Sequence, residues 1–211
     1  MFADQTWLAR AIWLALAGVV LTALVQWRLE LAFVALVTLA LSLAPVVVAQ
    51  WADIHVPPSF IAALVIFVGA TLFLGEILDF YERFWWWDIA MHATSAIGFG
   101  LIGFVLVFMM FQGDRYAAPP LALAFLAFCF AIFMGTAWEV FEFAMDQLFG
   151  LNMQKSGLMD TMGDLIVNMI GALIGAATGF AYLKGQARGG LAALIDEFVR
   201  GNPRFFRNGR K

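Results

Sequence analysis

Residues 121–143 read LALAFLAFCFAIFMGTAWEVFEF, and the first 18 of them carry no charge. A run of about 20 apolar residues in a helix crosses the hydrocarbon core of a bilayer. The strands of a membrane β-barrel are about half as long and alternate in polarity. Glu139 and Glu142 close the segment. This stretch therefore predicts a transmembrane helix with a polar end.

Five other apolar segments of similar length accompany it, at residues 7–25, 29–48, 60–78, 85–110 and 160–183. The 211-residue chain is 64% hydrophobic and only 13% charged, whereas soluble domains are about half apolar and about a quarter charged. These numbers predict an all-α polytopic membrane protein. We expect residues 1–184 to form one bundle of about six transmembrane helices.

Residues 185–211 form a basic tail with its own pattern. Leu191, Leu194, Ile195, Phe198 and Val199 recur at helical spacing. Basic residues lie around and after them at Arg188, Arg200, Arg204, Arg207, Arg210 and Lys211. The pattern predicts a short amphipathic helix on the cytoplasmic leaflet, bound to anionic lipid. The alternative is a frayed basic tail that only sets the topology.

Basic residues mark the cytoplasmic side of membrane proteins, so the tail places the C-terminus in the cytoplasm. Six crossings then place the N-terminus on the same side, in agreement with Arg10. Arg115, between the fourth and fifth segments, also falls inside. We expect membrane lipid as the surroundings and no nucleic-acid partner.

Three glycines repeat every four residues in the last segment, at Gly171, Gly175 and Gly179. Small residues at this spacing allow two helices to approach closely. Packing within one chain is the expected use, and a homo-oligomer is the alternative. The single cysteine, Cys129, excludes an intrachain disulfide and a zinc site of the CxxC type.

Acidic residues from four segments converge on one level of this topology, at the end away from the cytoplasm. Three polar stripes stand out: Asp88/His92, Glu139/Glu142 and Asp160/Asp164/Asn168. Residues three or four apart share one helix face. A charge facing lipid costs at least about 3 kcal/mol, so we expect the stripes to face one another around a polar cavity.

Several close carboxylates cannot all stay ionised without a counter-charge. Protonation, Arg83 or Lys155, or one divalent metal ion could supply it. A histidine with carboxylates suits zinc, manganese or iron, and carboxylates alone suit magnesium or calcium. The predicted metal ligands are Asp88, His92, Glu139, Glu142, Asp160 and Asp164, with Asn168 as a further polar site residue.

Structural roles compete with this interpretation. Asp160 and Asp88 could cap their helices, and a single intramembrane histidine can be a hydrogen-bonded packing residue. Four other acids have the positions of interfacial charges: Glu76, Asp79, Glu82 and Asp146.

Three stretches carry a resemblance: Trp87-Asp88-x-x-x-His92, Gly135-Thr136-x-Trp138-Glu139-x-x-Glu142 and Asp160-Thr161-Met162-x-Asp164-Leu165-x-x-Asn168-x-x-Gly171-Ala172. Together they resemble the uncharacterised bacterial inner-membrane family that includes YjdF. More remotely they are similar to the VanZ group linked to glycopeptide resistance, although the Trp138–Glu142 segment departs from that group. The resemblance implies a bacterial inner-membrane location and supports the polar residue set without naming an activity.

Three functions fit these observations. The first is a metal-dependent enzyme acting on a lipid or envelope substrate, with Glu139, Glu142 and Asp164 as catalytic residues. The second is a protein that binds or transports a cation or small amine, since an acidic vestibule attracts cations. The third is a structural membrane protein whose polar network fixes helix packing.

Overall fold

The computed structural model describes residues 4–111, 118–186 and 189–206, which contain helices and no strand. The expectations that rest on Arg115, Arg188, Arg207, Arg210 and Lys211 lie outside the described residues. The all-α architecture is confirmed. The chain divides into two compact units, Met1–Trp87 and Asp88–Lys211.

The first unit contains α1 (Trp7–Val25), α2 (Leu29–Trp51), α3 (Pro58–Val68), η1 (Gly69–Ile77) and α4 (Phe80–Arg83). Its core packs apolar residues of α1, α2 and α3, and the Trp13 indole N–H donates to Ser42 Oγ at 3.1 Å. The third span begins as an α-helix at Pro58 and continues as the π-helix η1. Asp79 follows in the left-handed conformation, with φ of 56°, and turns the chain into α4.

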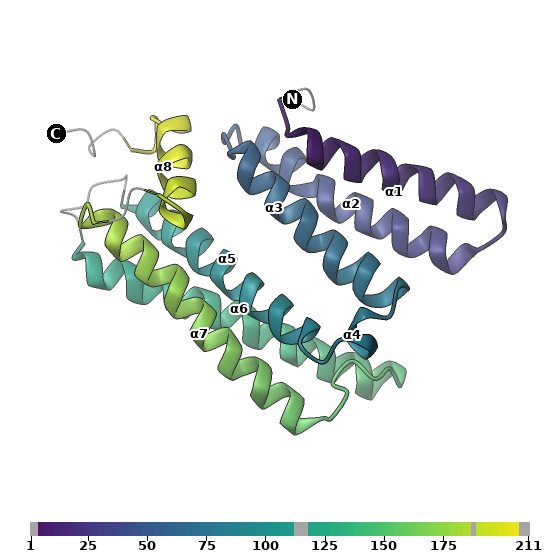
Figure 1. Ribbon diagram of the computed structural model, residues 1–211. Helices are drawn as coiled ribbons and strands as arrows, with labels where there is room; N and C mark the ends of the chain where they lie inside the picture. The colour runs from purple at the N-terminus through teal and green to yellow at the C-terminus, as the bar shows by residue number, and fades with distance from the viewer. Residues whose placement is uncertain (1–3, 112–117, 187–188, 207–211) are drawn as a thin grey trace. The chain divides into compact units, whose positions relative to one another are not determined.

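The second unit contains α5 (Trp87–Met110), α6 (Pro120–Phe149), α7 (Leu158–Leu183) and α8 (Leu191–Gly201), as Figure 1 shows. Trp87 opens α5 at the boundary of the units. Pro120 begins α6, where a proline costs no intrahelical hydrogen bond. Gly150 ends α6 in the left-handed conformation, with φ of 68°, which glycine adopts without steric cost.

The glycines of α7 allow α5 and α7 to pack backbone against backbone. A methyl group added at Gly175 would lie 2.7 Å from the carbonyl oxygen of Ile97 and 2.8 Å from Gly100 Cα. One added at Gly171 would lie 2.8 Å from the carbonyl oxygen of Ala93. The predicted packing within one chain is therefore what these glycines do in the structure.

The apolar face of α8 packs on the other helices of its unit. Ile195 is buried in a cluster with Leu101 and Phe104 of α5, and the Phe206 ring lies 5.2 Å from that of Phe108. The sequence pattern predicted that this face would be buried in the leaflet, whereas much of it is buried in protein. Contact of its basic residues with anionic lipid stays a prediction.

Among the described residues, six helices are long and apolar enough to cross a membrane, counting α3 and η1 as one span. Their bounds follow the predicted segments closely, with α6 continuing six residues past Phe143. Within the second unit, the two ends of α5 contact different groups. Asp88 and His92 lie in its first turns, near the polar stripes. Phe108, which contacts Phe206, lies about 30 Å from Asp88 along the helix axis.

Candidate metal centre

Three helices of the second unit each bring a polar pair to one level. Asp88 and His92 lie on α5, Glu139 and Glu142 on α6, and Asp164 and Asn168 on α7. Five of these six side chains are buried, namely His92, Glu139, Glu142, Asp164 and Asn168. Asp88 is the most open, with 27% of its side chain exposed. The predicted convergence of the three stripes is thus present in the structure.

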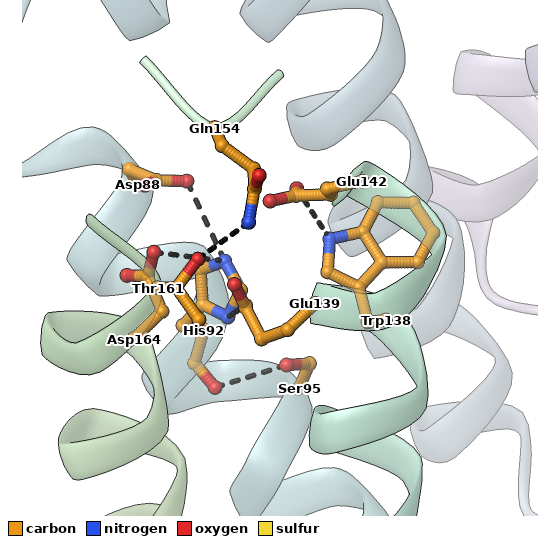
Figure 2. A network of polar contacts seen from close by, with 9 residues as sticks. All are labelled: Asp88, His92, Ser95, Trp138, Glu139, Glu142, Gln154, Thr161 and Asp164. Atoms are coloured by element: carbon orange, nitrogen blue, oxygen red, sulfur yellow. Dashed lines mark hydrogen bonds and ion pairs between the residues drawn. The ribbon is translucent and has the colours of Figure 1, made fainter. Parts of the chain in front are cut away.

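His92 is the centre of the group (Figure 2). Its Nε2 lies 3.7 Å from Asp88 Oδ1 and 3.9 Å from Asp164 Oδ2, while its Nδ1 lies 3.7 Å from Glu139 Oε1. These contacts are longer than the roughly 2.7–3.2 Å of a good N–H···O hydrogen bond. The imidazole therefore has carboxylates on both ring nitrogens but no close bond to any of the three.

Asp88, His92 and Asp164 can each turn one ligand atom toward a common point. The three ligand atoms all lie within 4.8 Å of one another. Two ligands bound tetrahedrally to zinc at about 2.1 Å lie about 3.4 Å apart. The distances from His92 Nε2 to Asp88 Oδ1 and to Asp164 Oδ2, 3.7 and 3.9 Å, exceed that value by a few tenths of an ångström. Small side-chain rotations would therefore bring these ligand atoms to the distances needed around one ion.

Glu142 has a partner of its own outside this group of three. The Trp138 indole N–H donates to Glu142 Oε1 at 2.7 Å, one helical turn along α6. Figure 2 shows the Glu142 carboxylate held away from His92 by this bond. The sequence separates Trp138 and Glu142 by four residues, a spacing that could have predicted the contact.

Asp160 lies half-buried in the first turn of α7, where an acidic residue complements the helix dipole. It does not belong to the group of three around His92 Nε2. The Lys155 ammonium is buried and acts electrostatically on Asp160. Arg83, the other cation considered, pairs with Asp79 at 3.7 Å within the first unit. Lys155 is thus a cation of the second unit that acts on an acidic residue of the site.

Two residues fix the loop between α6 and α7 beside the site: Asp146, which the sequence predicted to be an interfacial charge, and Gln154, to which it gave no role. Asp146 accepts hydrogen bonds from the Met153 and Gln154 backbone N–H groups, at 2.7 and 2.9 Å. The Gln154 side chain donates to Thr161 Oγ1 at 2.6 Å. In Figure 2 Gln154 reaches over the group from this loop. Asp146 therefore does more than the interfacial charge that its position predicted.

Asn168 occupies the deepest position. It is 1% exposed, and neither of its side-chain polar atoms has a hydrogen-bond partner among the described residues. Gly135 of α6 faces it, and a methyl group there would lie 2.7 Å from Asn168 Nδ2. Gly135 precedes Glu139 by one helical turn, so Asn168 lies one turn below Glu139.

Comparisons with known proteins agree with this architecture. Residues 8–185 match the family described as "Predicted membrane protein (DUF2238)". The chain belongs to this family. YjdF is also a member, so the resemblance noted from the sequence is confirmed, whereas the likeness to the VanZ group finds no support. The protein is accordingly an integral membrane protein with helical spans.

A curated relative from Thermotoga maritima, named "Uncharacterized protein", is 29% identical over 102 residues. The match covers 46% of this chain and 50% of the relative, so the chain spans about half the length of that protein. No solved structure matches the chain significantly.

Proposed function

We propose that the DUF2238 protein binds one divalent metal ion within the membrane, through Asp88, His92 Nε2 and Asp164. The observation that carries the proposal is the group of three ligand atoms, from two helices, within 4.8 Å of one another. The glycine seam, formed by Gly171 and Gly175 of α7 against the backbone of α5, holds these two helices together. The fold therefore positions the ligands before a metal ion binds. One imidazole with two carboxylates suits zinc, manganese or iron, and magnesium fits less well because it prefers oxygen ligands.

Charge balance supports the same assignment. Asp164 Oδ2 is buried and has no hydrogen-bond partner among the described residues. A buried charge without a partner is costly, and such groups usually pair or coordinate a metal. Two carboxylates with a neutral imidazole match the two positive charges of the ion.

Glu139 completes the proposed centre from the other side of the ring. Ligand histidines almost always donate their second ring N–H to a carboxylate or carbonyl, which fixes the tautomer. Glu139 Oε1 lies 3.7 Å from His92 Nδ1 and is the carboxylate in that position. The expected ligand set of six is thereby narrowed to three, with Glu139, Glu142 and Asp160 around them.

We further propose that this centre serves a metal-dependent enzyme acting on a lipid or envelope substrate. A metal with three protein ligands keeps an open position, where it can polarise a substrate or activate water. Glu139 and Glu142 are the carboxylates available as bases. The basic tail supports a bacterial inner membrane with both termini in the cytoplasm, so that the site faces outward. A fluorescent protein fused after Lys211 fluoresces only if that end is cytoplasmic.

Transport of a cation is the weaker candidate. Below Asn168 the described parts of α5, α6 and α7 are filled by the glycine seam and by a buried cluster that includes Leu101, Phe104 and Leu123. A polar route to the opposite face would have to pass through this packing. The geometry therefore favours a site that opens on one side.

The test is a metal titration of detergent-purified full-length protein after treatment with a chelator. Wild type is expected to take up one zinc or manganese ion per chain. Asp164→Asn should lose at least about 100-fold in affinity, because it removes a charged ligand. Asp196→Asn on α8 is the matched control and should bind like wild type. Equal binding by Asp164→Asn and wild type would refute the proposed centre.

A further inference from the structure

Glu139 and Asn168 are two buried polar residues of the site that are not among the three proposed metal ligands. Glu139 is 3% exposed and Asn168 is 1% exposed. No hydrogen bond of good geometry from the described residues reaches either carboxylate oxygen of Glu139 or either polar atom of Asn168, although Thr161 interacts with Glu139 and Asn168 with His92. A polar group buried without a good hydrogen bond costs free energy. A ligand that bonds to these atoms would recover that free energy.

These buried atoms are mainly hydrogen-bond acceptors. If Asp164 Oδ2 binds the metal and Glu139 Oε1 accepts from His92 Nδ1, two buried acceptors remain: Glu139 Oε2 and Asn168 Oδ1. A primary ammonium group carries three N–H donors and no acceptor. A phosphate or carboxylate offers only acceptors and would leave these two atoms unsatisfied. The inventory of buried atoms therefore selects a donor-rich ligand.

The charge around the site points the same way. Within the second unit five carboxylates surround the site, namely Asp88, Glu139, Glu142, Asp160 and Asp164. Lys155 and a divalent ion together balance three of these charges when all are ionised. The excess is negative, so it attracts a cation and repels an anion. A proton on one carboxylate could also remove the excess, and the experiment below separates the two cases.

Two exposed aromatic side chains lie on α6 next to Glu142. Trp138 is 47% exposed and Phe141 is 43% exposed, with ring centroids 5.3 Å apart. The indole N–H of Trp138 is already bonded to Glu142, which fixes the ring next to the acidic group. Aromatic faces attract ammonium groups, most strongly where water is excluded. This pair is therefore a surface on which an ammonium group can bind next to the acidic group.

We propose that Glu139 and Asn168 bind a primary ammonium group of the substrate, beside the metal held by Asp88, His92 and Asp164. The inference deepens the proposed function by naming the substrate class, an amine-bearing molecule of the membrane or envelope. Gly135 is part of the arrangement, because only a residue without a side chain leaves room for the Asn168 amide. Phosphate and phosphate monoesters are excluded as the recognised group.

The experiment measures the binding of n-butylammonium to the full-length protein by calorimetry, with n-butanol and n-butyl phosphate as matched probes at constant ionic strength. Butylammonium should bind at least tenfold more tightly than either probe. Glu139→Gln, which keeps the shape and removes the charge, should weaken butylammonium binding at least tenfold. Glu197→Gln on α8 is the matched control and should leave it unchanged.

Three outcomes would overturn the inference. In the first, butyl phosphate binds as tightly as butylammonium, a comparison that needs only the wild-type protein. In the second, folded Glu139→Gln binds butylammonium as tightly as wild type does. In the third, neither protein binds butylammonium, as expected if protonation of one carboxylate removes the excess negative charge.

The same titrations on zinc-loaded and zinc-free protein separate this inference from the metal proposal. Zinc uptake without butylammonium binding refutes only the ammonium site. Glu139-dependent butylammonium binding by a protein that takes up no zinc refutes only the metal centre. Nanodiscs with and without phosphatidylethanolamine identify the source of the amine, because a lipid amine should compete with butylammonium and a soluble one should not.

Discussion

At the scale of residues, spacing along each helix predicted which side chains share a face. It could not predict which atoms meet across helices. Asp88 and His92 are four residues apart, and their contact follows from helix geometry alone. The contact of His92 Nδ1 with Glu139 depends on how α5 and α6 rotate against each other. The sequence therefore predicted six candidate ligands, and tertiary packing brings ligand atoms of three of them, Asp88, His92 and Asp164, within 4.8 Å of one another.

Glu139→Gln provides a prediction at this scale. The glutamine keeps the volume of Glu139 but replaces the charged acceptor that faces His92 Nδ1. Loss of such a partner typically lowers metal affinity about 10–100-fold, with the metal ligands themselves intact. We expect zinc affinity to fall within that range and the limiting stoichiometry to stay at one ion per chain. A complete loss of zinc, equal to that of His92→Ala, would make Glu139 a direct ligand instead.

At the scale of elements, the ends of the helices follow from local chemistry. Pro58 and Pro120 lie at helix starts, and Gly150 ends α6, as such residues commonly do. The π-helix Gly69–Ile77 had no such signal, because its residues are ordinary for an apolar span. The loop contacts of Asp146 were equally hidden, since they join residues seven and eight positions apart.

The glycine seam between α5 and α7 gives a prediction at the scale of elements. Gly175→Ala would place a methyl group 2.7 Å from the carbonyl oxygen of Ile97 and 2.8 Å from Gly100 Cα, both backbone atoms. The helices must move apart, and overpacking of this kind costs about 1–3 kcal/mol. We expect a lower unfolding midpoint in an SDS titration, together with weaker zinc binding because Asp164 lies on the same helix.

Gly163→Ala is the matched control on α7. Nothing lies within 4 Å of a methyl group at that position. Alanine also favours the helix over glycine by about 1 kcal/mol. The control should therefore be as stable as wild type or more stable. If Gly175→Ala behaved in the same way as Gly163→Ala, the seam would not be what holds the two helices together.

At the scale of the whole molecule, composition alone predicted an all-α membrane protein, and the six apolar helices and the family match agree with it. The expected orientation in the membrane stays a prediction, because it depends on basic residues of which several lie outside the described part of the chain. Most of the length of α5 separates the polar group at its start from the contacts with the C-terminal segment near its end. We therefore expect substitutions in α8 to leave metal binding at the proposed centre unchanged.

The central claim is that Asp88, His92 and Asp164 hold one metal ion, and zinc X-ray absorption on the full-length, zinc-loaded protein tests it most directly. We predict one zinc per chain, bound by one imidazole and by oxygen atoms at about 2.0–2.1 Å. The imidazole scattering should disappear in His92→Ala. A sulfur neighbour at about 2.3 Å, which would implicate Cys129, or a wild-type protein that retains no zinc, would contradict the account.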